Sequence, residues 1–361
     1  MRFNDATEGR ILPRKLRGVT SKQVAERAGV SQTTVSFVLN RVDDSNISEA
    51  TRQRVLQAAE ELHYVPDMAA RALARGRSNN IALVIGQPHR QVFIDEYIPS
   101  ILTGLNQVTQ EHGFRILVEL VEAGKNSDSY VNLIRGKEVA GVIVNFVSPS
   151  AEDIHTAERC AADHLPIVSL GDLHPNIPSV TVDKLDGVRK VVGHLLSLGH
   201  RRIACISYAP FGQPHAMRRL GVYRETLESA GIQYDEALVR FGAHDPETGY
   251  AAMQSILRES APPTALFAMN DVMAFGAMAA IRDAGLRVPD DIAVAGFDDI
   301  RLARFACPPL TTVHEPDIEH GRRAGELLIS LINGQPPPEV HVRLEAQLIV
   351  RQSCGAGARP A

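Results

Sequence analysis

The first part of the chain carries apolar positions at helical spacing, interrupted by short polar breaks. Thr20 and Gln23 fit a capping box at the start of the first apolar stripe, which ends at Gly29. Ser31 is the N-cap candidate of a second short stripe, and Ser48 is that of a third, longer one. Two short helices joined by a glycine-containing turn, followed by a third helix, are typical of a helix-turn-helix domain.

In such a domain the second helix enters the major groove of DNA. Gln32 could then bond an adenine edge, and Phe37 could cover a thymine methyl group. The expected outward side chains are Ser31, Gln32, Thr33, Ser36 and Phe37. The alternative is a three-helix packing module with Phe37 in its core.

A short connecting segment follows the helical head. Pro66 stops the third helix, residues 68–75 are Ala-rich and helix-forming, and residues 76–80 are a polar linker. Because an isolated helix of under ~12 residues is marginal in water, we expect this segment to order only against a partner or DNA. The alternative is a plain linker with incidental helicity.

From Ile81 onward, short apolar runs alternate with amphipathic helical patterns, which predicts doubly wound parallel sheets. The length favours two such sheets in two lobes, with a ligand cleft outside the carboxyl ends of the strands. The predicted strands are 81–85, 115–120, 141–146, 167–170, 179–182, 202–207, 265–268 and 292–295, with helices that include 98–112, 187–198, 218–230 and 271–284.

Charge divides the chain in the same way. The net charge is −4, yet the first 80 residues carry 13 Lys and Arg against 9 Asp and Glu. A basic head on an acidic body suggests that the head binds a polyanion such as DNA. The alternative is a solvated charged face.

Composition and motifs exclude several classes of protein. The four cysteines lack the short spacings of a zinc site or a disulfide framework, which favours a reducing, cytoplasmic setting. No apolar run approaches the ~20 residues of a transmembrane helix, and no secretory signal is visible. The body contains no GxGxxG, GxxxxGK[ST], HExxH or GxSxG motif. We therefore expect neither an enzyme nor a cofactor or metal.

Separate segments carry a family resemblance. The head contains VTSKQVAERAGVSQTTVSFVLN at 19–40 and SEATRQRVLQAAEELHYVPDMAARALARGRSN at 48–79. The body contains HLLSLGHRRIACI at 194–206, FAMNDVMAFGAMAAIRDAGLRVPDDIAVAGFDD at 267–299 and PPLTTV at 308–313. In this order and spacing they resemble the LacI/GalR family of bacterial repressors over residues 19–350.

The resemblance implies a homodimeric transcription factor that binds a pseudo-palindromic operator, with a body of the two-lobed periplasmic-binding-protein type I fold. It implies a headpiece at 19–65, a hinge helix and linker at 66–80, and an effector-binding and dimerisation body at 81–350. We further predict a disordered extension at 1–18 before the headpiece and a tail at 351–361 after the body. Tetrameric members carry leucine heptads at the C-terminus, whereas this chain ends RQSCGAGARPA, so we predict a dimer.

For DNA, the resemblance implies contacts from Thr20, Ser31, Gln32, Thr33, Thr34, Ser36, Phe37 and Asn40, with Leu73 wedged into the minor groove. Phe37 stands where most members carry a base-reading Arg, so the usual family operator is not assumed. Gln23 and Ser21 depart from the acidic and apolar residues usual at their positions. The basic extension before Val19 could add phosphate contacts, although a disordered tail is favoured.

For the effector, the resemblance implies contacts from Tyr97, Phe146, Gln213, His215, Arg219, Asn270 and Asp298. An Arg fork donates to hydroxyls or a carboxylate, and a carboxylate accepts from vicinal hydroxyls, so the set suits a sugar or similar polyol. The structural alternatives are an Arg219–Asp298 ion pair between lobes, helix capping by Asn270, and a core position for Tyr97. An acid that many relatives place at Gly171 falls here at Asp172, which leaves the effector's identity open.

The mechanism that this implies is allosteric: the effector changes the angle between the lobes, and with it the spacing of the headpieces. The rival reading is a cytoplasmic small-molecule-binding or enzymatic α/β protein whose head docks another protein. Turnover of a substrate by the body would support this rival, and a sequence-specific DNA complex would reject it.

Overall fold

A computed structural model describes residues 19–39, 47–65, 78–86, 96–121, 128–146, 149–208 and 214–356. The chain divides into two units, which we call the head (Met1–Ser78) and the body (Asn79–Ala361). This division falls close to the predicted start of the body at Ile81. The predicted extension at 1–18 and most of the predicted hinge, 66–77, lie outside the described residues.

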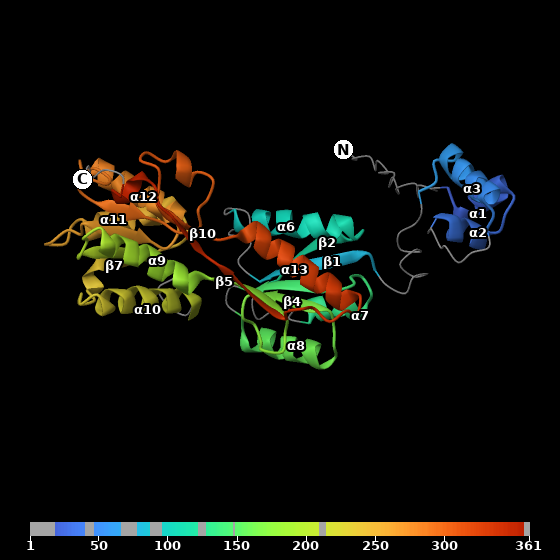
Figure 1. Cartoon of the computed structure of the whole chain (residues 1–361), viewed down its shortest axis with the longest axis horizontal. Helices are drawn as coiled ribbons and strands as arrows, with labels where there is room; N and C mark the ends of the chain where they lie inside the picture. The colour runs from blue at the N-terminus through green and yellow to red at the C-terminus, as the bar shows by residue number, and fades with distance from the viewer. Residues whose placement is uncertain are drawn as a thin grey trace, which may run out of the picture. The chain divides into compact units, whose positions relative to one another are not determined.

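The head contains the predicted helix-turn-helix: α1 (Ser21–Ala28), α2 (Gln32–Leu39) and α3 (Glu49–Glu61) (Figure 1). The capping box of Thr20 and Gln23 is present, and Gly29 ends α1 with a φ of +67°. Ser31 Oγ accepts a hydrogen bond from the backbone N of Thr34 at 3.1 Å. The three helices share a small core of Val24, Ala25, Ala28, Val35, Val38, Val55, Ala58 and Ala59.

One lobe of the body, the N-lobe, is built on a six-stranded parallel sheet in the order β11-β5-β4-β3-β1-β2. Its strands are β1 (Asn80–Gly86), β2 (Arg115–Leu120), β3 (Val142–Phe146), β4 (Ile167–Leu170), β5 (Ser179–Asp183) and β11 (His341–Glu345). Its helices are α6 (Tyr97–Glu111), α7 (Ser129–Arg135), α8 (Ala151–Ala162) and α13 (Asp317–Ile332).

Both faces of this sheet are buried, which is why its central strands are continuously apolar. Ile81, Leu83 and Ile85 of β1 pack with residues of α6 and α13. The alternating residues Ala82 and Val84 pack with residues of α7 and α8.

The other lobe, the C-lobe, has a four-stranded parallel sheet in the order β7-β6-β8-β9. Its strands are β6 (Ile203–Tyr208), β7 (Val239–Gly242), β8 (Ala265–Ala268) and β9 (Ala293–Ala295). Figure 1 shows helices α9 (Lys184–Ser197) and α10 (Pro214–Ser229) on one side of this sheet and α11 (Pro246–Ile256) and α12 (Asp271–Asp283) on the other. The two sheets confirm the predicted doubly wound, two-lobed body.

The chain passes between the lobes after β5, after β10 (Thr312–His314) and after β11. In the C-lobe β10 pairs antiparallel with β12 (Gln347–Ile349). Strands β7, β10, β11 and β12 were not predicted. β7 and β11 lie at sheet edges and bury only part of their length, and β10 and β12 are short, so none forms an apolar run.

The predicted tail begins inside the folded body. The backbone N of Arg351 donates to Thr311 Oγ1 at 2.8 Å, and a 3-10 turn at Gln352–Cys354 buries Ser353 and Cys354. The C-lobe therefore continues past the predicted boundary at residue 350. Among the described helices, none combines the length and apolar character needed to cross a membrane.

Candidate functional site

The predicted DNA-binding residues that the structure describes lie on α2 and at the starts of α1 and α2. Gln32, Thr33 and Phe37 are exposed on α2. Phe37 is 40% exposed and takes no part in the head core, which excludes the alternative of a core phenylalanine. Asn40 and Leu73 lie outside the described residues.

The remaining predicted residues of the head have local hydrogen bonds. Thr20 Oγ1 accepts from the backbone N of Gln23 at 3.4 Å, and the hydroxyls of Ser31 and Thr34 lie 2.9 Å apart. Ser36 is half-buried. These contacts fix the ends of α1 and α2, and through them the direction in which the exposed face of α2 points.

A cleft of about 2400 Å³ lies between the lobes of the body. Its walls include the residues at and just after the carboxyl ends of strands in both sheets, as expected for this fold class. These are Gly86, Phe146, Gly171 and Asp172 from the N-lobe and Tyr208, His244, Asn270 and Asp298 from the C-lobe.

The predicted effector residues that the structure describes all line this cleft: Tyr97, Phe146, His215, Arg219, Asn270 and Asp298. Gln213 lies outside the described residues. Contact of these side chains with a ligand stays a prediction. Among the described residues, no cluster of His, Cys, Asp and Glu is arranged to hold a metal ion.

Arg219 is buried on α10 and pairs with Glu315, whose Oε1 lies 3.0 Å from Arg219 Nη2. The guanidinium also lies over the Phe297 ring, 4.2 Å from its centroid. Lys184 Nζ pairs with the other carboxylate oxygen of Glu315. Burial raises the pKa of Glu315, but the two cations lower it by more, so the carboxylate is held ionised.

The predicted alternative of an Arg219–Asp298 ion pair between lobes is wrong in both respects. Among the described residues, the ion-pair partner of Arg219 is Glu315, and both Arg219 and Asp298 belong to the C-lobe. Burial, followed by the neighbouring Glu315 and Asp271, raises the pKa of Asp298 well above its ordinary value. Asp298 thus faces the cleft with a carboxyl group that a hydroxylated ligand could stabilise.

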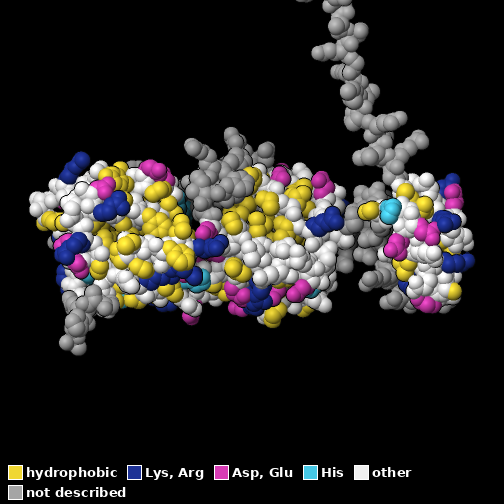
Figure 2. Space-filling view, turned by 90° about the horizontal axis from the view of Figure 1, so that it is seen from above, with side chains coloured by type: hydrophobic (Ala, Val, Ile, Leu, Met, Phe, Trp, Pro, Cys, Tyr) yellow, Lys and Arg dark blue, Asp and Glu magenta, His cyan; other side chains and the backbone are white. Residues whose placement is uncertain are grey.

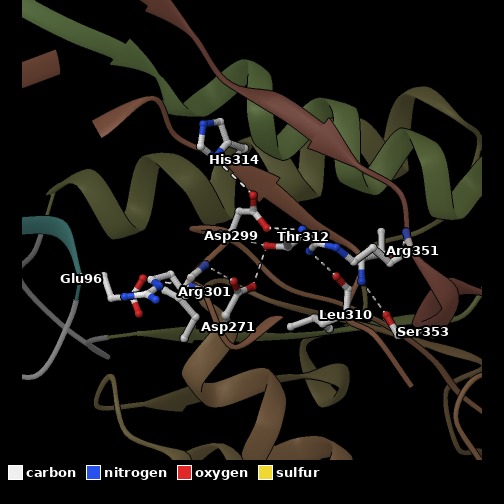
Figure 3. A network of polar contacts seen from close by, with 11 residues as sticks. Glu96, Asp271, Asp299, Arg301, Leu310, Thr312, His314, Arg351 and Ser353 are labelled. Carbon is white, nitrogen blue, oxygen red and sulfur yellow. Dashed lines mark hydrogen bonds and ion pairs between the residues drawn. The ribbon is translucent and has the colours of Figure 1, made fainter. Parts of the chain in front are cut away.

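A polar network joins α12 to the loop and strand that border the cleft (Figure 3). Asp271 accepts from Thr312 Oγ1 at 2.6 Å and from the backbone N of Ile300 at 2.9 Å. Asp299 pairs with Arg351 at 2.6 Å and with His314 at 3.2 Å. The network therefore fixes the loop that carries Asp298.

One bond of this network links the two lobes directly. Glu96, at the start of α6 in the N-lobe, accepts from the backbone N of Arg301 in the C-lobe at 3.0 Å (Figure 3). Arg301 is three residues beyond Asp298 along the same loop. The loop that carries a predicted ligand residue is thus also held across the mouth of the cleft.

Asn270 has two structural roles. Its Oδ1 accepts from the backbone N of Met273 at 2.8 Å, which confirms the predicted helix cap. This bond leaves Nδ2 as the donor toward His244 Nδ1, 3.0 Å away. Burial, followed by Arg219, lowers the pKa of His244 to about 4, so the ring is neutral with its proton on Nε2.

The N-lobe wall also contains polar groups that could receive a ligand. Tyr97 is half-buried against the core of the N-lobe, as the alternative of a core position predicted, and it also lines the cleft. Asn145 Oδ1 lies 3.4 Å from Tyr97 Oη, while its buried Nδ2 has no acceptor among the described residues. His320 binds the backbone oxygen of Val180 through Nε2 at 2.8 Å, which leaves Nδ1 as an acceptor.

Comparison with known proteins gives the family. The model for bacterial regulatory proteins of the lacI family matches residues 20–67, and the periplasmic binding protein-like domain matches 192–354. The HTH-type transcriptional regulator CelR of Thermobifida fusca is 34% identical over 338 residues, which cover 92% of this chain and 98% of that protein. The chain belongs to the LacI family of bacterial regulatory proteins.

Solved structures agree with this family. A CelR–cellobiose complex has a TM-score of 0.67 at 32% identity, over 93% of this chain and 99% of that one. The Lac repressor dimer bound to operator and the anti-inducer ONPF has a TM-score of 0.81 at 30% identity, over 94% and 99% of the two chains. The protein is therefore a DNA-binding transcriptional regulator of the LacI family, and the rival reading of its head as a protein-docking module is not favoured.

Several cleft residues of this LacI-family regulator were missed by sequence reasoning: Lys184, Asn145, His244, Glu315 and His320. Asn145 had a signal, since it is a polar residue inside the apolar strand GVIVNF. His244 follows β7, which was itself not predicted. Lys184 and Glu315 come from the segments that pass between the lobes, where no periodic pattern marks a residue as buried.

Asp271 of the regulator should make stability depend on pH. Burial raises the pKa of this carboxyl to about 7, partly offset by its bonds to Thr312 and Ile300. Because the folded state favours the protonated form, the free energy of unfolding should fall as pH rises from about 4 toward 7 and level off above. Asp271→Asn removes the titration, so between pH 5 and 8.5 the wild type should lose ~3 kcal/mol relative to the variant.

Urea unfolding at several pH values measures this difference. Asp291→Asn is the control, because the pKa of Asp291 is lowered by its bonds to Arg287 and the carboxylate is exposed. If the free energy of unfolding changes with pH in parallel for the wild type and Asp271→Asn, Asp271 is ionised throughout the range.

Proposed function

We propose that this regulator binds a pseudo-palindromic operator as a homodimer in the cytoplasm and is controlled by a neutral sugar in the interlobe cleft. In the cleft, the cations Arg219 and Lys184 both pair with Glu315. This pairing is the observation that favours a neutral ligand over an anionic one. We further infer that the protein is not an enzyme and needs no cofactor.

The charges of the cleft support a neutral ligand over an anionic one. An incoming phosphate or carboxylate would have to displace Glu315 from Arg219 and leave that carboxylate buried without its partner, which is costly. A hydroxyl can accept from the guanidinium without displacing Glu315. Asp298 and His320 Nδ1 offer acceptors, and Asn145 Nδ2 and His244 Nε2 offer donors. This mixture of donors and acceptors suits vicinal hydroxyls and a ring oxygen.

Titration calorimetry tests the ligand class. The first ligands are cellobiose, which the CelR complex contains, and other neutral mono- and disaccharides. Each binding sugar is then compared with its phosphate ester or uronic acid. Neutral sugars should bind more tightly than their anionic derivatives, and the reverse order would reject the neutral-ligand proposal.

The dimer proposal rests on the symmetry of the operator and on the dimeric Lac repressor. Figure 2 shows hydrophobic side chains gathered over both lobes of the body on the face that it draws. Exposed large apolar residues of the body include Leu302, Phe305 and Ile318, which are 62%, 76% and 48% exposed. Surface of this kind fits burial between copies of the chain. Sedimentation equilibrium of the purified protein tests the dimer.

Allosteric control requires the effector to bind the two arrangements of the lobes differently. Asp298 and Arg301 share a loop, and Glu96 of the N-lobe holds that loop at Arg301. A ligand that binds Asp298 would therefore act on a direct contact between the lobes. Because coupling is reciprocal, operator DNA should change effector affinity by the same factor as effector changes operator affinity.

The binding function is tested by selecting sites from a random duplex library with the full-length protein at near-physiological salt. An enriched palindrome supports the proposal. The selection is repeated with a pool of sugars, because a member of the family that needs a corepressor would bind only then. No enrichment in either arm, or turnover of a sugar by the body, would favour the rival reading.

Leu73→Ala should weaken binding to the selected operator far more than binding to random DNA. The reason is that a minor-groove wedge acts only where the duplex is bent at the centre of a specific site, whereas phosphate contacts act on any sequence. Fluorescence anisotropy on both duplexes at one salt concentration measures the two losses. Equal losses would reject the wedge role of Leu73.

A further inference from the structure

The exposed face of α2 contains an aromatic ring that the head does not use. Phe37 is 40% exposed, whereas Val35 and Val38 beside it are buried. Among the large apolar residues of α2, Phe37 alone is exposed. Covering an exposed aromatic ring removes apolar surface from water, which lowers the free energy. The exposure of Phe37 therefore favours a contact between its ring and a partner outside the head.

The neighbours of Phe37 define what that contact can be. Thr33 lies one helical turn before Phe37 and is also exposed, so the two side chains share a face. Gln32 and Ser36 are similarly spaced on an adjoining face. A helix lying in the major groove would thus present hydrogen-bonding side chains together with a ring that has neither donor nor acceptor.

The major groove contains one prominent apolar group, the C5 methyl of thymine. We propose that Phe37 reads this methyl at one defined position of each operator half-site, and that it accepts 5-methylcytosine there for the same reason. Cytosine, adenine and guanine place a hydrogen or polar atoms opposite the ring and leave it partly uncovered. This inference rests on the proposed role of α2 in reading operator DNA.

The test replaces single thymines of the selected operator by deoxyuridine, which keeps the base pair and removes only the methyl group. At one position per half-site, wild-type affinity should fall about fourfold, the value expected for one buried methyl. Phe37→Ala should bind the thymine operator more weakly than the wild type and should be insensitive to deoxyuridine at that position. Replacing the same thymine pair by a 5-methylcytosine pair should cost less than replacing it by an unmethylated cytosine pair.

Gln32→Ala is the matched control, because it is exposed on the same helix but carries an amide. It should weaken binding and keep the deoxyuridine effect. Thermal unfolding checks that both variants fold, as expected for side chains outside the head core. The methyl-reading role of Phe37 is wrong if deoxyuridine at every position lowers the affinity of Phe37→Ala as much as that of the wild type. It is also wrong if the wild type binds the 5-methylcytosine and cytosine operators with equal affinity.

These experiments distinguish a failure of the methyl-reading role of Phe37 from a failure of operator binding by the protein. An enriched palindrome that is bound equally well with thymine or deoxyuridine at every position overturns the role of Phe37 alone. Failure to enrich any palindrome, with or without sugars, overturns operator binding and the methyl reading together.

Discussion

Arg219→Ala is expected to abolish the response to effector while the effector-free protein still binds its operator. The half-maximal effector concentration should rise by roughly 10²-fold or more, because hydrogen bonds to a charged donor contribute about 1.5–3 kcal/mol each. The change in operator binding across a sugar titration, followed by fluorescence anisotropy, measures the response. Calorimetry on the body measures ligand binding directly.

The size of this effect follows from the surroundings of Arg219. Arg219 is 4% exposed, and its guanidinium contacts Glu315 at 3.0 Å and the Phe297 ring. A donor that is already positioned loses little entropy when a ligand binds it, so its removal is costly to binding. Lys184 remains beside Glu315 in the variant, so that carboxylate keeps one counter-charge and the C-lobe should still fold.

Arg224→Ala on the same helix is the control. Arg224 is exposed, pairs with Glu228 at 2.7 Å and does not line the cleft. Its loss should leave the effector response unchanged. An Arg219→Ala protein that keeps the wild-type response would remove Arg219 from the effector site. An Arg219→Ala protein that loses operator binding as well would assign the residue to the fold.

The sequence was sufficient for most of the fold because the central strands of both lobes bury both faces. Strands 167–170 and 265–268, which are buried along their whole length, were predicted at their observed bounds. The edge strand β2 is only partly buried, but it was also predicted at its bounds because four of its six residues, RILVEL, are apolar. The edge strands β7 and β11 were missed because they are partly buried and polar or charged residues interrupt their apolar ones. The head helices were predictable for a different reason, since their caps are local pairs such as Thr20 with Gln23.

The candidate site was predictable only in part. The family resemblance located Arg219, Asn270 and Asp298, which the structure brings to one cleft. It did not locate Glu315, which follows β10 and reaches Arg219 from a position 96 residues away in sequence. A pairing of this kind depends on how the crossing segments fold against α10, and no spacing along the chain encodes it.

Glu315 is therefore the residue whose change should alter stability most among the charged groups of the cleft. Glu315→Gln removes the carboxylate that neutralises both Arg219 and Lys184. Breaking a buried ion pair from one side costs about 3–5 kcal/mol, because the remaining charge stays buried without compensation. Urea unfolding at pH 7 should show a loss of this size in the free energy of unfolding of the body.

The pH dependence of this loss has a defined sign. The pKa of Glu315 in the folded protein lies below its ordinary value of 4.5, because Lys184 and Arg219 outweigh the effect of burial. The stability that the carboxylate contributes is thus complete above about pH 5 and is lost as pH falls through the folded pKa. The difference between the wild type and Glu315→Gln should accordingly be largest near neutral pH and should shrink in acid.

Glu228→Gln provides the comparison within the same lobe. Glu228 pairs with Arg224 at 2.7 Å, but its side chain is 46% exposed against 3% for Glu315. Water and salt screen an exposed pair, so its loss should change the unfolding curve little. If the two variants lose similar stability, the Arg219–Glu315–Lys184 cluster contributes no more than a surface pair, and Glu315 would then not disfavour anionic effectors.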